Sequence, residues 1–341
     1  PVHDWYRNTT DNNLLYWGLD YPPLTAYFSW AWGKIAELIY PEMVELYTSR
    51  GIETDQVNLF MRVSAIVSDV LVFFPAAVAF VTTYFRDRKD AQLKTLILLM
   101  SQPALLLIDH GHFQYNSVAL GLALWAAVSA LRGNDLWAAV FFSLSLNYKQ
   151  IALYYSPAFF FYLLHRVFHA PSVARGLKVF FSLAAVTLVT FGICWLPWLI
   201  GGKAQVMDVV HRVFPFARGL FEDKVANVWC ALSPLIKFKT LFTVPQLALI
   251  SAVCTLLAGV FSVIKLLLVR IRPSAALMLG MLASSLGFFL FSFQVHEKSI
   301  LFALLPATML AFELPSLSLV FNTAACFSMF PLLLKDNLVV P

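Results

Sequence analysis

Long apolar runs dominate this chain and predict a bundle of membrane-spanning helices. Polar segments separate ten such runs, which cover residues 63–85, 93–108, 117–131, 136–148, 151–168, 178–200, 244–269, 274–294, 299–314 and 316–334. A helix needs about 20 apolar residues to cross a bilayer. Several runs are shorter, so we expect some helices to be tilted, re-entrant or broken. The pattern predicts an all-α polytopic membrane protein.

Two longer mixed stretches interrupt this pattern. In the first, residues 19–40 are rich in Trp and Tyr, and the pair Pro22-Pro23 ends any helix that begins earlier. After that pair we expect an amphipathic helix in the lipid headgroup region. The predicted organisation is a loop with an interfacial helix (1–62), transmembrane helices with short polar junctions (63–200), a long loop (201–243) and further transmembrane helices (244–341).

The composition supports a membrane protein. Hydrophobic residues make up 60% of the chain and charged residues 13%, whereas about a quarter of a soluble domain is charged. The net charge of +5 comes from Lys and Arg that mostly lie between apolar runs. Basic residues there set membrane topology, so we expect no nucleic-acid partner. The four cysteines show no CxxC spacing, and we expect free thiols rather than a zinc or redox site.

The distribution of basic residues orients the chain in the membrane. Most Lys and Arg of the short loops fall on one side, which the positive-inside rule makes cytosolic. The polar segments on the opposite, non-cytosolic face are 1–23, 109–116, 147–150, 201–243 and 294–298. Asn8-Thr9-Thr10, on the same face, is a glycosylation sequon. We therefore expect the functional side chains to share this face.

The first candidate cluster surrounds Asp20. This carboxylate lies beside Tyr16, Trp17 and Tyr21 in the sequence. Aromatic rings that stack on a pyranose, with a carboxylate that accepts hydroxyl protons, are typical of a sugar subsite. The alternative is that Asp20 only caps the turn before Pro22.

The second cluster, residues 109–117, offers six hydrogen-bonding side chains. They are Asp109, His110, His112, Gln114, Tyr115 and Asn116. An Asp beside two His is a combination found in metal sites. However, side chains at i and i+2 do not share a helical face, and no third His is near. We expect polar packing or substrate contact here, and no metal.

Two further junctions carry candidate phosphate ligands. Lys149, followed by Gln150, lies between two apolar runs, where a lysine either extends to the headgroups or meets an anionic lipid phosphate. In QVHEKS (294–299), His296 and Lys298 are suited to holding a phosphate while Glu297 orients one of them. The alternative is a simple ion pair at a helix end.

The stretch 208–230, DVVHRVFPFARGLFEDKVANVWC, places charges of both signs among aromatic residues. Its candidate ligands are Arg218, Glu222, Asp223 and Lys224. This combination suits a surface that holds a polar ligand at a membrane face. A solvated interfacial loop explains it equally well.

Five blocks of this sequence resemble one enzyme family. They are LLYWGLDYPPLTAY (14–27), DHGHFQYNSVALG (109–121), LNYKQIALYYSP (146–157), FPFARGLFEDKVANVW (214–229) and FSFQVHEKSILF (291–302). They are similar to the signature blocks of the endoplasmic-reticulum dolichyl-phosphate-glucose glucosyltransferases of the asparagine-linked glycosylation (ALG) family, glycosyltransferase family 57 of the GT-C superfamily. The sequence FEDKVANVW within the fourth block favours the branch that adds the first glucose to the nine-mannose precursor over the branch that adds the second.

The resemblance implies a GT-C-type transmembrane bundle in the endoplasmic-reticulum membrane, with lumenal loops that carry interfacial helices and a lumenal active site. The implied donor is dolichyl-phosphate glucose. The implied acceptor is the dolichol-diphosphate-linked Man9GlcNAc2 oligosaccharide, glucosylated with inversion through an α-1,3 linkage and without a cofactor. Such a reaction needs a base for the acceptor hydroxyl and cations for the departing phosphate. The family's acidic motif, and with it the main general base, is expected upstream of Pro1, and its last helices beyond residue 341.

The resemblance also assigns expected roles. His296 and Lys298, with Arg218, bind the donor phosphate, and Lys149 faces the lipid phosphate. Asp20 contacts a sugar first and acts as a base second. The expected donor or glucose pocket comprises Asp109, His112, Gln114 and Asn116, and the expected acceptor contacts are Asp20, Glu222 and Asp223. Further substrate-binding candidates are Tyr21, His110, Tyr115, Gln150, Lys224 and Glu297.

Two rival functions remain at this point. One is the second-glucose branch of the same family, and the other is a polytopic lipid or sugar transporter. Transporters place ionisable groups near the bilayer midplane and often contain paired repeats. Here the charges lie at the ends of apolar runs, and the sequence shows no internal repeat. Asp69, the exception inside a long run, is expected to hydrogen-bond to a neighbour rather than to relay protons.

Overall fold

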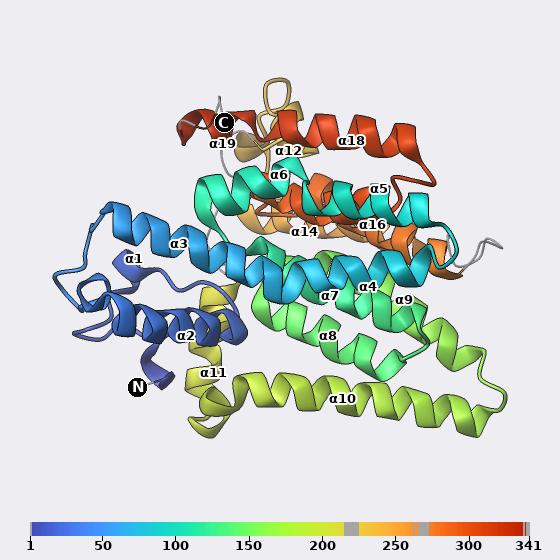
Figure 1. Cartoon of the computed structure of the whole chain (residues 1–341), viewed down its shortest axis with the longest axis horizontal. Coiled ribbons are helices and arrows are strands. Elements are labelled where there is room, and N and C mark those ends of the chain that lie inside the picture. Colours follow the sequence, from blue (N-terminus) through green and yellow to red (C-terminus); the bar gives the residue numbers. More distant parts are fainter. Residues whose placement is uncertain (1, 215–224, 262, 265–272, 337, 339–341) are drawn as a thin grey trace.

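Helices form the regular structure of this protein in the computed structural model (Figure 1). The structure describes the chain except residues 1, 215–224, 262, 265–272, 337 and 339–341. The helices of the first half are η1 (Val2–Asp4), α1 (Leu14–Trp17), α2 (Pro23–Ile39), η2 (Pro41–Val44), α3 (Asp55–Ser68), η3 (Asp69–Phe73), α4 (Phe74–Tyr84), α5 (Lys89–Met100), α6 (Pro103–Leu105), η4 (Leu106–Phe113), α7 (Asn116–Leu131), α8 (Asp135–Tyr148), η5 (Gln150–Tyr155) and α9 (Ser156–Phe168).

The second half of the chain continues the bundle. Its helices are α10 (Val173–Ile200), α11 (Lys203–Val213), α12 (Val228–Leu232), α13 (Phe238–Leu241), α14 (Val244–Thr255), η6 (Leu256–Val260), α16 (Pro273–Phe291), η7 (Glu297–Ile300), α17 (Leu301–Met309), α18 (Pro315–Ser328) and α19 (Phe330–Lys335). Within the described residues there is no β-strand. The prediction of an all-α protein is confirmed.

Five described helical segments are long and apolar enough to cross a membrane. They are Asp55–Tyr84, Lys89–Phe113, Val173–Ile200, Ser274–Phe291 and Pro315–Lys335. Two shorter apolar helices cover Asn116–Leu131 and Val244–Val260. A lipid bilayer has no water to satisfy the backbone, so a helix that closes its own hydrogen bonds is the fitting element. The chain is therefore a polytopic membrane protein.

The first of these segments begins earlier than the apolar pattern predicts. The helix starts at Asp55, upstream of the expected boundary at residue 62. Thr54 caps it, because its side-chain oxygen accepts a hydrogen bond from the backbone N–H of Val57 at 3.3 Å. A capping residue and polar first turns thus extend the helix ahead of its apolar part. The described part of the long loop expected over 201–243 likewise forms the helices α11, α12 and α13.

Helix α7 lies at the centre of the bundle and packs against α4, η3 and α8. Its close approach to η3 depends on Gly121. A Cβ atom on Gly121 would lie 3.0 Å from the Cα of Phe73 and 3.0 Å from a methyl of Val72. The two helix backbones are therefore nearly in contact at this point.

We expect Gly121→Ala to destabilise the protein, because the new methyl pushes α7 away from η3. Overpacking of this kind costs about 1–3 kcal/mol. Gly33→Ala in α2 is the matched control, since nothing lies within 4 Å of its Cβ position. Thermal unfolding of both variants in detergent measures the difference. An equal melting temperature for Gly121→Ala and wild type would show that α7 and η3 accommodate the methyl group without loss of stability.

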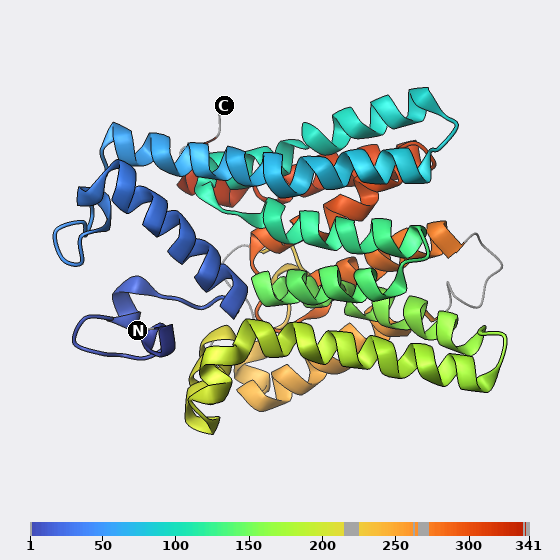
Figure 2. The same ribbon diagram turned by 60° about the horizontal axis from the view of Figure 1, so that its bottom comes forward.

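One end of the bundle carries the N-terminal segment, α1, α2 and α11 (Figures 1 and 2). A small apolar core joins these pieces to the end of α10. It consists of Tyr6, Ala26, Trp198, Val209 and Val213. An ion pair between Arg7 and Asp208 adds a polar link between the N-terminal segment and α11. This core positions the segments that cover the end of the bundle.

Candidate active site

A cavity of about 450 Å³, which we call the central cavity, lies between five segments that are far apart in the sequence. Its lining consists of Asp20, Tyr21, Lys149, Gln150, Ile151, Tyr154, Arg212, Val213, Phe214, Ala248, Phe293, Gln294, His296, Lys298 and Ser299. The lining therefore contains candidate residues from three sequence clusters that were identified separately. It combines cationic, acidic and aromatic side chains in one space.

A second cavity of about 200 Å³, the side cavity, adjoins the central cavity. Tyr21 and Lys149 line both. The other lining residues of the side cavity are Leu19, Thr25, Ser29, Phe113, Gln114, Tyr115 and Tyr148. Two of these, Gln114 and Tyr115, come from the predicted cluster at 109–117.

Lys149 is the buried cation between the two cavities. Helix α8 ends at Tyr148, and Lys149 continues in an extended conformation with only 4% of its surface exposed. Its Nζ donates hydrogen bonds to Asn116 Oδ1 and, at 3.1 Å, to Gln114 Oε1. The ammonium also lies 5.4 Å from the centre of the Tyr21 ring. This burial contradicts the alternative in which Lys149 extends to the lipid headgroups.

Asp109 anchors the network that holds Lys149. Its buried carboxylate accepts a hydrogen bond from Asn116 Nδ2 at 2.6 Å and another from the backbone N–H of Ser117 at 2.7 Å. A carboxylate at the start of a helix is favoured by the free N–H groups there, in this case those of α7. Asp109 thereby orients Asn116, whose side-chain oxygen faces the lysine.

The two histidines of the same cluster face other helices. His110 Nε2 lies 2.8 Å from Asp69 Oδ2, and His112 Nδ1 lies 2.6 Å from Asp336 Oδ2. Neither histidine lines the central or the side cavity. The hydrogen bond expected for Asp69 is confirmed. Among the residues that the structure describes, no three His, Cys, Asp or Glu side chains are grouped as a metal site would require.

The central cavity gathers positive charge. Lys298, in η7, and His296, the residue before η7, line it together with Lys149. Burial lowers the pKa of Lys149, and the nearby positive charge of Lys298 lowers it further, while Asp109 and Asp20 oppose the shift. Two ammonium groups that repel each other in a buried space are stabilised when an anion binds between them. The geometry thus favours an anionic ligand.

Asp20 and Tyr21 contribute polar groups to the same lining. Burial, with a smaller effect from the Asp20 carboxylate, raises the pKa of Tyr21 to about 12, so its hydroxyl stays protonated. Gln150 holds this segment in place, because its Nε2 donates to the backbone oxygen of Asp20 at 3.1 Å. The Oε1 atom of Gln150 is buried and has no hydrogen-bond partner among the described residues. An unsatisfied acceptor in a cavity wall is well placed to receive a ligand hydroxyl.

The structure adds residues that the sequence analysis did not select. Arg212 lines the central cavity, and its Nε donates to the backbone oxygen of Leu19 at 3.1 Å. Gln294 lines it too and has a φ of 63°, which is rare for a residue other than glycine. Arg212 belongs to the charged stretch 208–230, so its charge could have identified it as a candidate ligand from the sequence. Tyr154 lies inside an apolar run, so its sequence context did not distinguish it from a residue of the apolar core.

Other predicted site residues are placed elsewhere or lie outside the described residues. Glu297 belongs to η7 but does not line either cavity. The predictions for the acceptor contacts and the donor phosphate also included residues in 215–224. These are Arg218, Glu222, Asp223 and Lys224, which the described part of the structure does not include.

Comparison with known proteins identifies similar chains. The family described as "ALG6, ALG8 glycosyltransferase family" matches residues 1–341. A Dictyostelium discoideum protein, "Probable dolichyl pyrophosphate Man9GlcNAc2 alpha-1,3-glucosyltransferase", is 49% identical over 100% of this chain and 66% of its own length. The "Dolichyl pyrophosphate Man9GlcNAc2 alpha-1,3-glucosyltransferase" proteins of Gallus gallus and Mus musculus are each 45% identical over 100% of this chain and 67% of their own length. The chain thus spans about two thirds of the length of these relatives.

Proposed function

This chain belongs to the ALG6, ALG8 glycosyltransferase family, and on that basis we propose that it transfers glucose from dolichyl-phosphate glucose to a lipid-linked Man9GlcNAc2 oligosaccharide. The product carries an α-1,3-linked glucose. The printed names of the relatives support the acceptor and the linkage. The sequence resemblance supports the donor, the endoplasmic-reticulum membrane and a lumenal active site.

The observation that carries this proposal is the convergence of cations in the central cavity. The cationic side chains are those of Lys149, Arg212 and Lys298, which line one space together with His296 and Asp20. A glycosyl phosphate donor requires positive groups at its phosphate, because negative charge increases there as the bond to the sugar breaks. A neutral sugar beside it requires acceptors and donors such as Asp20, Tyr21 and Gln150.

The residues support a single displacement. The acceptor hydroxyl attacks C1 of the glucose while the bond from C1 to the phosphate oxygen breaks. Dolichyl phosphate leaves with the electron pair, and the cations of the cavity neutralise it. The hydroxyl proton passes to a carboxylate base. Asp20 binds sugar hydroxyls in this scheme, and it accepts the proton only as a second role.

The direct test supplies both substrates to the full-length protein that contains this chain. The protein is reconstituted in nanodiscs with synthetic dolichyl-phosphate glucose and a lipid-linked nine-mannose acceptor, with EDTA present. Mass spectrometry then reads the added hexose, and we expect one. Addition only to an acceptor that already carries one glucose would move the assignment to the second-glucose activity. No addition, with or without divalent metal, would overturn the proposal.

We expect donor binding to weaken as the pH rises through the pKa of Lys149, because only the protonated amine attracts the phosphate. Lys298→Ala removes the repulsion that helps to lower this pKa. The pKa of Lys149 therefore rises in the variant, and the alkaline limb of kcat/KM for the donor moves to higher pH. The pH profiles of wild type and variant measure this shift. An unmoved limb, or one moved to lower pH, contradicts the assignment.

A further inference from the structure

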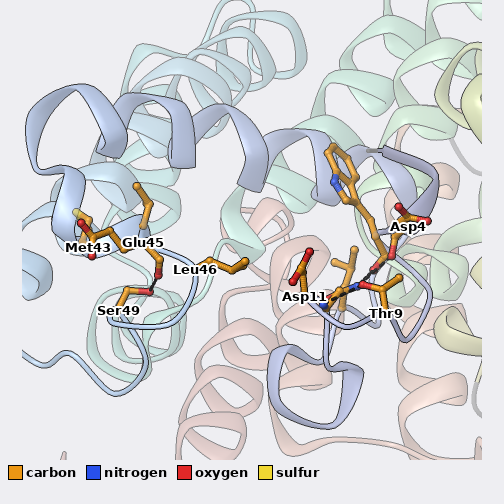
Figure 3. Close-up of a pocket in the computed structure, with 11 residues that line it drawn as sticks. Asp4, Thr9, Asp11, Met43, Glu45, Leu46 and Ser49 are labelled. Atoms are coloured by element: carbon orange, nitrogen blue, oxygen red, sulfur yellow. Dashed lines mark hydrogen bonds between the residues drawn. The ribbon is translucent and has the colours of Figure 1, made fainter.

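A third cavity, of about 550 Å³, lies beside the N-terminal segment at the same end of the bundle (Figure 3). We call it the outer hollow. Two pieces of chain line it, the segment before α2 and the turns that follow α2. The lining consists of Asp4, Trp5, Thr9, Asp11, Asn12, Leu19, Met43, Val44, Glu45, Leu46 and Ser49. Figure 3 shows Asp4, Thr9 and Asp11 on one side, Met43, Glu45 and Ser49 on the other, and Leu46 between them.

The chemistry of this lining suits an uncharged, hydroxyl-rich ligand. Among the residues that the structure describes around it, the polar groups are carboxylates, hydroxyls, an amide and the indole of Trp5, and no Lys, Arg or His lines the hollow. The lining therefore offers nothing that would attract a phosphate. Apolar side chains accompany the acceptors, and Leu46 and Val44 remain 48% and 40% exposed. Sugar rings present hydroxyls at their edges and C–H groups on their faces, which match these two kinds of surface.

The walls of the outer hollow are held in place by hydrogen bonds. Tyr47 joins the two pieces of chain, because its hydroxyl donates to Asp11 Oδ1 at 2.8 Å. The Asn12 side chain donates to the backbone oxygens of Asp4 and Arg7, each at 3.0 Å. The hollow is thus formed before any ligand arrives, which lowers the entropy cost of binding.

The outer hollow is adjacent to the candidate active site. Leu19 lines both the outer hollow and the side cavity, and the side cavity shares Tyr21 and Lys149 with the central cavity. Tyr6 strengthens this connection, because its hydroxyl donates to the backbone oxygen of Tyr21 at 2.7 Å. The segment 19–21 therefore forms a wall of all three cavities. A ligand in the hollow lies next to the segment that contacts the reacting sugars.

The size of the acceptor calls for such a neighbouring site. The central cavity, at about 450 Å³, is in the range that holds a drug-sized ligand. An oligosaccharide of nine mannoses and two N-acetylglucosamines is much larger than this. Most of its sugars must lie outside the central cavity while its terminal mannose reacts.

We propose that the outer hollow is a carbohydrate subsite that binds hexose residues of the acceptor other than the one that receives glucose. Acidic and hydroxyl side chains hydrogen-bond to the sugar hydroxyls, and Leu46 and Val44 pack against ring faces. This inference rests on the proposed function, because it takes the oligosaccharide acceptor as its ligand. It adds a binding site that is separate from the phosphate-binding cations.

The test fills the hollow and compares two acceptors. Ser49→Trp places a large ring in the lining, whereas Glu53→Trp introduces the same ring at an exposed residue of the same connection, which does not line the hollow. For the full oligosaccharide we expect Ser49→Trp to raise KM about 5- to 10-fold with kcat within about twofold, as loss of one or two hydrogen bonds would. A short acceptor that contains only the reacting branch should show no change in either variant.

Two results would overturn the subsite. One is an unchanged KM for the full acceptor in Ser49→Trp, and the other is an equal rise for both acceptors. Binding of the free nine-mannose glycan, followed by saturation-transfer NMR on the purified protein, tests the site without catalysis. We expect binding to wild type and to Glu53→Trp, and loss of binding in Ser49→Trp. If wild type fails to bind the glycan the subsite is wrong, whereas bound glycan without glucose transfer would count against the proposed function alone.

Discussion

Replacing Lys298 with alanine is expected to lower the rate of glucose transfer by about 100- to 1000-fold. Lys298 lines the central cavity together with Lys149, and its charge is close enough to lower the pKa of Lys149. In the proposed reaction, dolichyl phosphate gains negative charge as it leaves the glucose, and the ammonium of Lys298 then stabilises it most strongly. The loss should therefore appear in kcat as well as in KM for the donor. Single-turnover transfer with saturating dolichyl-phosphate glucose measures the chemical step.

Two control variants separate loss of the charge from loss of the fold. Lys298→Arg retains a cation and should recover part of the rate. Lys34→Ala removes an exposed lysine of α2 that pairs with Glu37 at 2.5 Å, outside all three cavities. It should leave transfer unchanged, since surface ion pairs contribute little. A wild-type rate in Lys298→Ala would rule out its assignment to the donor phosphate.

Replacing Asp109 with alanine is expected to have the second large effect, on both stability and activity. The carboxylate accepts hydrogen bonds from Asn116 and from the backbone of Ser117, and all three groups are buried. Each buried group left without a partner costs about 1–3 kcal/mol. Asn116 would also lose the contact that orients it toward Lys149. We expect a lower melting temperature and a rate reduced about 100-fold, since misplacement of a positioning network by about 1 Å has effects of that size.

A matched control is available at the opposite end of the bundle. Asp135 pairs with Arg166 at 3.2 Å, and the arginine is half exposed. Asp135→Ala also removes a carboxylate from the start of a helix, in this case α8, but it is remote from the three cavities. It should change the melting temperature only slightly and leave transfer intact. If Asp109→Ala lowers the melting temperature and the rate of transfer no more than Asp135→Ala does, Asp109 does not position Lys149.

The position of the charged groups also bears on the transporter alternative. The central cavity is lined by basic side chains at or next to helix ends, together with Asp20, Tyr21 and the end of α11, which belong to the segments that cover one end of the bundle. Asp69 and His110 form an acid–histidine pair that joins the apolar segments Asp55–Tyr84 and Lys89–Phe113. Among the described residues, no other such pair has both members in these two segments. The pair of Asp69 and His110 lines neither the central nor the side cavity. A one-sided site of this kind supports an enzyme.

Local patterns in the sequence were enough to place most helices. Where the structure describes them, the apolar runs are mostly helical, because a chain inside a bilayer must satisfy its own backbone hydrogen bonds, although 310–314 at the end of one run form turns and a bend. Pro22 and Pro23 correctly predicted where α2 begins, since proline is favoured at the first turn. The start at Asp55 was missed because Thr54 acts through capping, which an apolar pattern does not contain.

The sequence by itself determined that this is an all-α membrane protein and to which family it belongs, and it predicted that the polar junctions share one face. Only the tertiary structure decided which side chains meet. It buried Lys149 against Asn116, turned His110 and His112 toward separate acids, and added Arg212 to the central cavity. The physical reason is that spacing along a helix predicts only neighbours within a few residues. Contacts between residues 33, 41 or 224 positions apart, such as these, depend on how whole helices pack.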